Sequence, residues 1–180
     1  MLTGIQVAII GGDARQLEVI KRCVEMDANV MLIGFENLQS EFSGANKRTL
    51  EPETVKNIDA LVLPIVGTDE QGFVESIFSF TPLQLTDEII AALPKKVQVY
   101  TGIAKPYLST LMKKYNIPYI EMLSLDDVAI YNSIPTVEGA LMMAIQHTDI
   151  TIHGSHSVVL GMGRVGMTLA RTLSNLGANV

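Results

Sequence analysis

Short apolar runs alternate with helical patterns along the first two thirds of the chain. Residues 6–10 (QVAII) are typical of a buried strand, because β-branched side chains dominate the run and a Gly-Gly pair ends it. Residues 14–26 place Leu17, Ile20 and Val24 on one face of a helix. This strand followed by a helix is the first unit of a pattern that repeats.

The same alternation continues to residue 123. Four further strands are expected, over 29–34, 60–67, 97–102 and 118–123. Two further helices are expected, over 86–94 and 105–115. Residues 36–58 favour only a weak strand or a short helix, and residues 68–85 a long loop or a small hairpin. Alternating strands and helices predict an α/β fold, a flavodoxin- or Rossmann-like doubly wound parallel sheet of about five strands.

A helix over residues 131–147 is expected to connect two parts of the chain. Val137, Leu141 and Ile145 recur at helical spacing, and Pro135 is expected in the first turn, where proline is tolerated. Ser133 and Thr136 then stand at the polar start of that helix. They are interpreted either as capping and solvated side chains or as groups that face a substrate.

The remaining residues repeat the opening pattern. Residues 148–157 are expected to form a connector or an edge strand, 157–161 (SVVLG) a buried apolar strand, and 164–176 a helix. The chain is thereby divided into three parts. These are a flavodoxin-like α/β domain over 1–130, a connecting helix over 131–150, and the truncated start of a Rossmann domain over 151–180.

The most informative motif is G-x-G-x-x-G at Gly161, Gly163 and Gly166, between the expected strand and helix. Gly161 would make the tight turn, Gly163 would let a pyrophosphate approach the backbone, and Gly166 would let helix and strand pack closely. The helix N-terminus would offer free N–H groups to the phosphates, with Arg164 and Val165 in the same turn. The motif predicts NAD or NADP as cofactor; the alternative is a glycine-rich turn without a ligand.

The choice between NAD and NADP is expected to depend on a residue about 20 positions after the first glycine, beyond Val180. The expectation is therefore a fragment of a longer protein that binds the nucleotide weakly or not at all. A strand contributed by another chain would be a second way to complete the fold.

A second glycine turn, GGDARQ, follows the first strand. Asp13 with Gln16 three residues later resembles a capping box, which accounts for both residues without a ligand. The other interpretation is substrate binding by Gly12, Asp13 and Arg15, because ligands of parallel sheets bind outside the carboxyl ends of the strands. Gly102, at the end of the expected strand over 97–102, joins this group.

Composition excludes several classes of function. The net charge is −6 and no stripe of Lys or Arg occurs, which argues against nucleic acid as a partner. The uninterrupted apolar runs are too short to span a bilayer and the N-terminus lacks a basic region, so neither a membrane segment nor a signal peptide is expected. The single cysteine, Cys23, excludes an internal disulfide and favours a buried small side chain in a reducing compartment.

Neither a metal site nor a catalytic group emerges from the pattern. His147, His153 and His156 do not have a metal-ligand spacing and are expected to be surface or packing residues. No Ser/His/Asp or Cys/His arrangement occurs, so the catalytic residues stay unknown.

Three stretches together carry a family resemblance: MLTGIQVAIIGGDARQLEVI, DDVAIYNSIPTVEGALMMAIQHTDITIHGS and VVLGMGRVGMTLARTLSNLGANV. They resemble the dipicolinate synthase A subunits of spore-forming bacteria over the whole chain. The resemblance implies a cytoplasmic, NAD(P)-dependent oxidoreductase subunit of the mother cell that oxidises a dihydrodipicolinate-type compound to dipicolinate during sporulation. It further implies the flavoprotein-like dipicolinate synthase B subunit as partner, a dicarboxylate substrate held by Arg15, Lys105 and the start of the connecting helix, and a homo-oligomer.

Two alternatives stay open at this point. One is another two-lobed NAD-dependent dehydrogenase, of the 2-hydroxyacid or alanine type. The other is a non-catalytic docking domain for the partner subunit.

Overall fold

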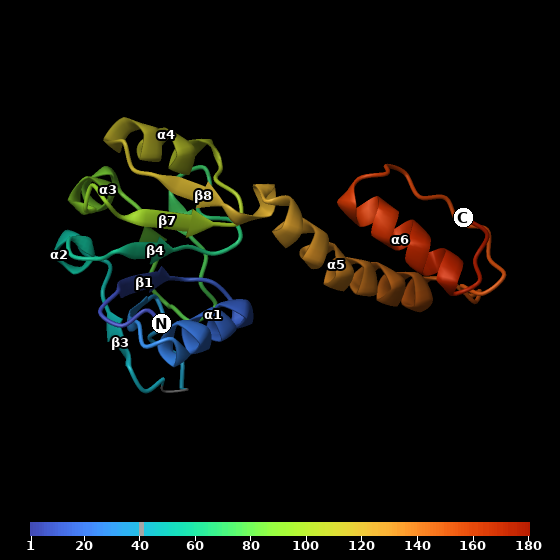
Figure 1. The fold of residues 1–180 in the computed structure, drawn as a ribbon, viewed down its shortest axis with the longest axis horizontal. Coiled ribbons are helices and arrows are strands. Elements are labelled where there is room, and N and C mark those ends of the chain that lie inside the picture. Colours follow the sequence, from blue (N-terminus) through green and yellow to red (C-terminus); the bar gives the residue numbers. More distant parts are fainter. Residues whose placement is uncertain (40–41) are drawn as a thin grey trace. The chain divides into compact units, whose positions relative to one another are not determined.

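The computed structural model describes residues 1–39 and 42–180. These residues form two compact units, Met1–Met122 and Leu123–Val180, called here the first and second unit (Figure 1). Each unit is described by itself.

The first unit is built on a parallel sheet. Its strands are β1 (Gln6–Ile10), β2 (Asn29–Ile33), β3 (Ala45–Arg48), β4 (Ala60–Val62), β7 (Gln98–Thr101) and β8 (Tyr119–Glu121). They lie in the order β3-β2-β1-β4-β7-β8, and each neighbouring pair is parallel. The order reverses between β1 and β4, as it does in dinucleotide-binding folds. The expected parallel α/β sheet is confirmed.

The sheet formed by the described residues has six strands, one more than the sequence predicts. The additional strand is β3, at one edge, whose Asn46, Lys47 and Arg48 are exposed. An exposed polar edge strand carries no apolar run, and the segment 36–58 therefore has only a weak strand signal. Residues 40 and 41 of that segment lie outside the described residues.

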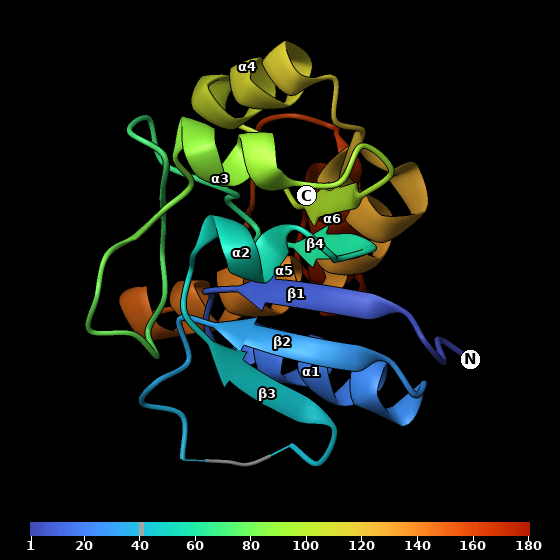
Figure 2. The ribbon, with the colours of Figure 1, turned by 90° about the vertical axis from the view of Figure 1, so that its left-hand side faces the viewer.

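Both faces of the sheet are covered, because inward-pointing side chains alternate along β1. Val7 and Ile9 pack in one core cluster with Ile20 of α1 (Ala14–Glu25). Ala8 and Ile10 belong to the opposite cluster. There they meet α2 (Pro52–Val55), α3 (Asp87–Ala92) and α4 (Pro106–Tyr115), and Figure 2 shows α1 on one side of the strands and these helices on the other.

A small hairpin interrupts the alternation after β4. Strands β5 (Phe73–Val74) and β6 (Leu83–Gln84) pair antiparallel. This pairing confirms the hairpin interpretation of residues 68–85. A 3-10 turn, η1 (Met122–Ser124), leads out of the first unit.

The second unit consists mainly of two helices, α5 (Asp126–His147) and α6 (Arg164–Asn175). The prediction that Pro135 lies in the first turn of a helix starting at residue 131 is wrong. Helix α5 starts five residues earlier, with Asp126 and Asp127 in its first turn, where acidic side chains favour the helix dipole. Pro135 lies inside the helix and lacks the N–H that would bond the carbonyl of Tyr131.

The buried strand expected over residues 157–161 does not form. Residue 156 makes one parallel bridge, to Asn179, and the side chains of Val158 and Leu160 are 85% and 93% exposed. A parallel strand is stabilised by neighbours on both sides, whereas the described residues give this segment only the 177–179 segment as a neighbour. Helix α6 confirms the helix expected over 164–176.

Helix α5 is long and apolar enough, by length and composition alone, to cross a membrane. An 18-residue window has a mean hydropathy of 1.3, and 11% of that window is buried. The same helix carries Glu138 and packs the buried Ser133 and Val137 within the second unit.

Candidate nucleotide turn and switch-point cavity

The glycine motif forms a tight turn at the start of α6. Gly161 has φ of +97°, a conformation that favours glycine. A Cβ placed on Gly166 would lie 1.8 Å from the carbonyl oxygen of Gly161, so the turn folds directly onto the first helical residues. Gly163 is the N-cap, and a Cβ there would meet no atom within 4 Å. The two roles are therefore distinct: Gly161 and Gly166 allow the turn, and Gly163 leaves open space beside it.

The N-terminus of α6 is available for an anion. Among the described residues, no side chain caps this helix, and the first internal bond runs from the N–H of Met167 to the carbonyl of Gly163 at 2.9 Å. The N–H groups before Met167 are the ones that a helix leaves to water or a ligand. These features fit a pyrophosphate.

Arg164 is engaged within the second unit. Its Nη1 donates to Oδ1 of Asp126 at 3.1 Å, and the two side chains are 45% and 88% exposed. An exposed pair of this kind contributes little stability, so a phosphate could compete for the guanidinium. Val165 follows in the same turn and is exposed.

In the first unit, a cavity of about 170 Å³ lies where the strand order reverses. It is lined by residues that follow β1 and β4 and by residues after β5: Gly12, Asp13, Arg15, Pro64, Ile65, Val66, Glu75 and Ile77. Parallel sheets bind ligands at this switch point. The structure thus brings Gly12, Asp13 and Arg15 together at one opening.

The backbone hydrogen-bonding groups of the first glycine turn are already bonded to residues 75–77 of the same chain. The N–H of Gly12 donates to the carbonyl of Glu75 at 2.7 Å, and the N–H of Ile77 donates to the carbonyl of Gly12 at 3.1 Å. A Cβ on Gly11, which has φ of +61°, would lie 2.6 Å from the oxygen of Glu75. The glycine turn therefore leaves room for the backbone of residues 75–77 to pack against it. In other folds with this strand order, a phosphate binds at this position.

Asp13 and Arg15 form an ion pair in which both carboxylate oxygens accept hydrogen bonds from the guanidinium. Asp13 caps α1 by accepting from the N–H of Arg15 at 2.9 Å, and the guanidinium donates to both carboxylate oxygens, from Nε to Oδ1 at 2.9 Å and from Nη2 to Oδ2 at 2.5 Å. These hydrogen bonds hold the pKa of Asp13 below its usual value and raise that of Arg15. A substrate carboxylate would have to compete with Asp13 for Arg15.

The capping interpretation of this turn is confirmed for Asp13 only. Gln16 does not complete a capping box: its side chain is 8% exposed, its Cγ lies against Gly12, and its Nε2 has no partner among the described residues.

The other predicted substrate residues do not line this cavity. Gly102 follows β7, and a Cβ there would lie 2.6 Å from the carbonyl oxygen of Ile65, so its glycine permits a close backbone approach. Ser133 and Thr136 belong to the second unit. Ser133 is buried, donating to the carbonyl of Ile130 at 2.6 Å and lying 3.0 Å from the hydroxyl of Thr168.

The capping role expected for Ser133 is wrong, because α5 starts at Asp126 and places Ser133 two turns inside the helix. Thr136 likewise bonds within the helix, to the carbonyl of Asn132 at 2.8 Å.

Sequence reasoning missed Glu75 and Ile77, whereas Ile65 belongs to the strand end over 64–68 where a site was expected. Glu75 is an exposed carboxylate on the segment after β5, and the sequence around it matches no motif. Its place beside Asp13 depends on the bridge between Gly12 and Ser76, which joins residues far apart in the chain.

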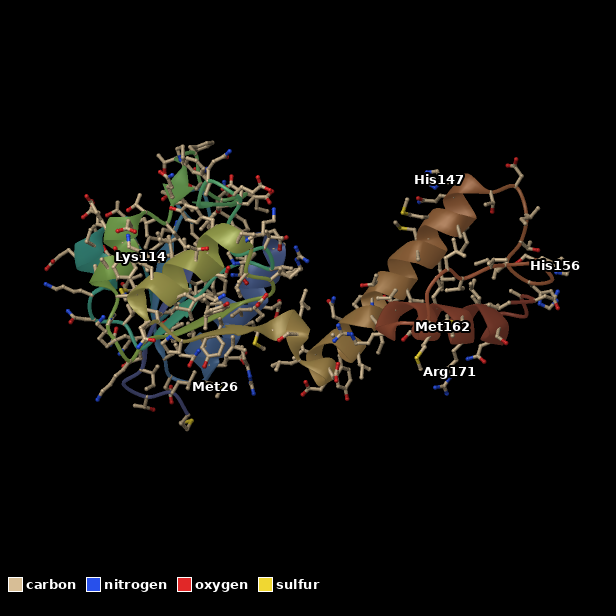
Figure 3. The ribbon with its side chains drawn as sticks, turned by 90° about the horizontal axis from the view of Figure 1, so that it is seen from above. Met26, Lys114, His147, His156, Met162 and Arg171 are labelled. Carbon is tan, nitrogen blue, oxygen red and sulfur yellow. The ribbon has the colours of Figure 1, made fainter. Side chains whose placement is uncertain are left out.

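The histidines fit the surface role expected of them. His147, His153 and His156 are all exposed, and Figure 3 labels His147 and His156 on the second unit. Across residues 1–39 and 42–180, no group of three His, Cys, Asp or Glu side chains is placed to hold a metal ion. Cys23 is half-buried, and burial raises the pKa of its thiol.

The sheet order, the helices on both faces and the glycine turn before α6 define an α/β protein of the Rossmann-like class. Residues 6–123 match the family described as the N-terminal domain of the dipicolinate synthase A subunit. The chain belongs to this family.

Several relatives extend the similarity over the whole chain. The dipicolinate synthase A subunit of Bacillus subtilis (strain 168) is 45% identical over 180 residues, covering 100% of this chain and 61% of the relative. The crystal structure of the dipicolinate synthase A subunit from Bacillus halodurans is 50% identical, with a TM-score of 0.92 over 98% of this chain and 61% of that one. The crystal structure of the Bacillus subtilis protein has a TM-score of 0.93, at 45% identity over 100% of this chain and 60% of that one. The chain thus spans about three fifths of the length of these relatives.

Proposed function

We propose that this chain is part of a dipicolinate synthase A subunit, an NAD(P)-dependent oxidoreductase that converts a dihydrodipicolinate-type compound to dipicolinate during sporulation. Membership of the family supports the substrate class. The observation that carries the cofactor is the turn at Gly161–Gly166, which is tight, uncapped and open at Gly163.

When bound, the nicotinamide cofactor would accept a hydride from the dihydro ring, and loss of a proton to a base would complete the conversion to the aromatic pyridine. The role proposed for this chain is to hold the pyrophosphate. The free N–H groups at the start of α6 would donate to the phosphate oxygens, and the missing Cβ of Gly163 would let those oxygens approach. Arg164 would add a positive charge on release from Asp126.

The dicarboxylate is proposed to bind at the carboxyl edge of the sheet, where Gly12, Asp13, Arg15 and Gly102 lie. The cavity itself carries two acidic side chains and one basic one, so a dianion requires a further cation. Lys105, at the start of α4 on the same edge, is the residue proposed to supply it.

We further propose that the partner of this chain is the dipicolinate synthase B subunit, that the protein acts in the cytoplasm of the mother cell, and that it forms a homo-oligomer. These three proposals rest on the family resemblance. Thr136, which is exposed, remains a proposed substrate residue of the connecting helix, whereas the hydroxyl of Ser133 is buried against Ile130 and Thr168. The proposed organisation is an N-terminal domain over 1–130, a helix over 131–150 and the start of a nucleotide-binding domain over 151–180.

Nucleotide binding is tested by titrating NADH and NADPH fluorescence against this chain and against the longer Bacillus subtilis relative. We expect the relative to bind at least about tenfold more tightly, because a dinucleotide fold also holds the ribose and nicotinamide with later strands. The matched variant replaces Gly163 with Ala in this chain and is expected to weaken binding without unfolding α6. Equal affinity of the two proteins, or full binding by the Gly163 variant, would contradict the cofactor assignment.

The reaction is tested with the longer relative together with its partner protein. Dipicolinate formation is followed by its ultraviolet absorbance, beside a panel of 2-hydroxy acids and alanine. Turnover of a 2-hydroxy acid or alanine, with none of the dihydro compound, would favour the other two-lobed dehydrogenases instead.

A further inference from the structure

Residues 75–78 cross the carboxyl ends of β1 and β2 and are held there from both strands. Their backbone is bonded to the first glycine turn, after β1. The hydroxyl of Ser76 donates to the carbonyl of Gly34, after β2, at 2.7 Å, and the ring of Phe78 stacks on that of Phe35 with the ring centroids 5.4 Å apart. The backbone on this side of the switch-point cavity is therefore fixed.

Three of the residues that line the switch-point cavity are titratable: Asp13, Arg15 and Glu75. Asp13 accepts hydrogen bonds from the guanidinium and the backbone of Arg15, which hold the pKa of its carboxyl below the usual value and make it a poor proton acceptor. Arg15 is a cation without an acceptor atom. Glu75 is exposed, and its carboxylate has no hydrogen-bond or ion-pair partner within residues 1–39 and 42–180. Glu75 is therefore the lining side chain that is free to take up a proton.

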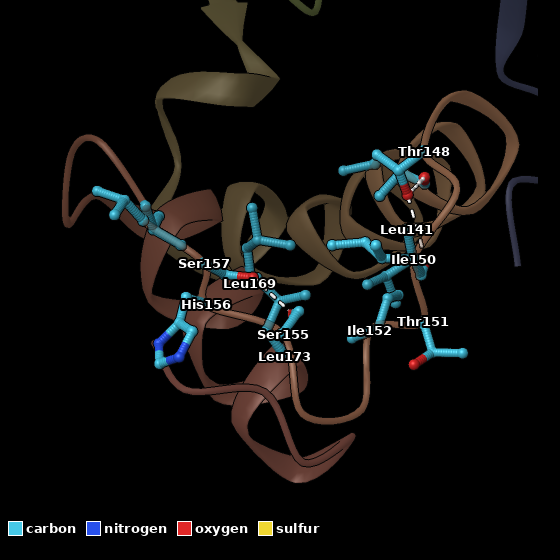
Figure 4. A pocket seen from close by; sticks show the side chains of 14 residues that line it. Leu141, Thr148, Ile150, Thr151, Ile152, Ser155, His156, Ser157, Leu169 and Leu173 are labelled. Atoms are coloured by element: carbon cyan, nitrogen blue, oxygen red, sulfur yellow. Dashed lines mark hydrogen bonds between the residues drawn. The ribbon is translucent and has the colours of Figure 1, made fainter.

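The cavity in the second unit offers a different environment (Figure 4). It has a volume of about 320 Å³ and is lined mainly by apolar side chains, among them Leu141, Leu169 and Leu173. His156 is titratable, but no Lys or Arg is among the described residues that line this cavity. A dicarboxylate bound there would leave both of its charges unpaired, so the switch-point cavity, which Arg15 lines, suits the substrate better.

The chemistry of the proposed function requires a proton acceptor, and the present inference rests on that function. Aromatisation of a dihydro ring to a pyridine breaks two bonds to hydrogen. One hydrogen leaves as a hydride, with both electrons of its bond, and reduces the nicotinamide. The other leaves as a proton, and the electrons of its bond complete the aromatic ring. A base within hydrogen-bond reach must accept that proton.

We propose that Glu75 is the general base of this reaction and accepts the proton directly from a substrate bound in the switch-point cavity. Each turnover converts the dihydro compound, the oxidised nicotinamide cofactor and the Glu75 carboxylate into dipicolinate, the reduced cofactor and the Glu75 carboxylic acid. The carboxylic acid then returns its proton to water. The fixed backbone of residues 75–78 places the base beside the cavity, and the exposed side chain has the rotational freedom to follow the ring.

The first experiment measures proton uptake when dipicolinate binds to the 180-residue chain. Isothermal titration calorimetry at about pH 6, where an ordinary glutamate is ionised, is carried out in buffers of different ionisation enthalpy. Wild-type chain takes up protons, because a dianion beside the Glu75 carboxylate favours its neutral form. Glu75→Gln loses this uptake and binds dipicolinate about tenfold more tightly, since one like charge leaves the cavity.

Two further variants serve as controls for charge and for position. Glu18→Gln removes the same charge from an exposed glutamate of α1 that does not line the cavity, and it behaves like wild type. Asp13→Asn changes the other carboxylate of the cavity and keeps a side-chain oxygen that can cap α1. Proton uptake persists in this variant.

The second experiment follows dipicolinate formation by the whole A subunit to which this chain is proposed to belong, together with its partner protein. Glu75→Gln lowers kcat by about 10²- to 10⁴-fold, the usual contribution of a general base, without raising KM. Wild-type activity falls in acid, because protonated Glu75 cannot accept a proton, and this fall is absent from Glu75→Gln. Glu75→Asp keeps a carboxylate and recovers part of the rate.

The outcomes separate the role of Glu75 from the proposed function. A wild-type chain that does not bind dipicolinate, or a whole subunit that does not form it, would overturn the proposed function and the role of Glu75 with it. Dipicolinate formation at equal kcat in wild type and Glu75→Gln would overturn the role of Glu75 alone. The same holds for proton uptake that disappears in Asp13→Asn but not in Glu75→Gln. A lower kcat in Glu75→Gln with an unchanged pH profile would show a structural role instead.

Discussion

Replacement of Gly166 by Ala is expected to disrupt the start of α6. The new Cβ would lie 1.8 Å from the carbonyl oxygen of Gly161, far inside ordinary van der Waals contact, and that oxygen belongs to the backbone. Either the turn or the helix must shift, and forced overpacking of this kind costs about 1–3 kcal/mol. The free energy of opening α6 should fall by this amount.

The assay is amide hydrogen exchange in α6, because the chain forms two compact units and a global unfolding curve would mix them. A loss of about 1–3 kcal/mol accelerates exchange by about 5- to 150-fold for the amides from Met167 onward. Gly163→Ala is the control: Gly163 has φ of −78° and open space around it, so α6 should exchange as in wild type. If both variants behave like wild type, the tight turn does not depend on the glycine at 166.

Three further predictions follow from local contacts. Asp13→Ala removes the cap of α1 and should lower the free energy of unfolding by about 1 kcal/mol. Because Arg15 lowers the pKa of Asp13 from 3.8, this advantage is present above about pH 4 and is lost as the pH falls through the folded-state pKa. Amide hydrogen exchange in α1, compared between variant and wild type at about pH 7 and in acid, measures it, and an equal difference at both contradicts it. Cys23 should react with iodoacetamide more slowly in the native chain than in urea, because burial raises the pKa of its thiol; equal rates would count against this. Gly139→Ala, inside α5 with no atom within 4 Å of the new Cβ, should stabilise the helix by about 0.5–1 kcal/mol in hydrogen exchange, and a loss of protection would refute it.

The elements with local signals were predictable. The strand at 6–10 and the helix from Ala14 are visible because their side chains bury one face at a fixed period. The G-x-G-x-x-G turn was predictable because the reasons for its glycines are local. Gly161 adopts a positive φ, and a side chain on Gly166 would clash with the carbonyl oxygen of Gly161. Strand β3 was weakly predicted because an exposed edge strand requires no apolar side chains.

For β3 the sequence predicts too little structure, whereas for the segment 157–161 it predicts a strand that does not form. Its composition predicts a buried strand, but burial depends on what lies beside it, and Val158 and Leu160 are exposed. The composition of a segment indicates how strongly it favours burial. It does not indicate whether other strands or helices pack beside it. Helix α5 similarly extends past the expected start, because packing against α6 outweighs the cost of Pro135 inside it.

The sequence by itself determined the parallel α/β class, the glycine turn before α6 and the capping of α1 by Asp13, because each depends on residues that are neighbours along the chain. Tertiary structure alone decided that Glu75 and Ile77 hydrogen-bond to Gly12, that the Asp13–Arg15 pair shares a cavity with Pro64 after β4, and that Ser133 contacts Thr168. These arrangements join segments far apart in sequence. They depend on how distant parts of the chain pack together, and the local pattern of apolar and polar residues does not predict such contacts.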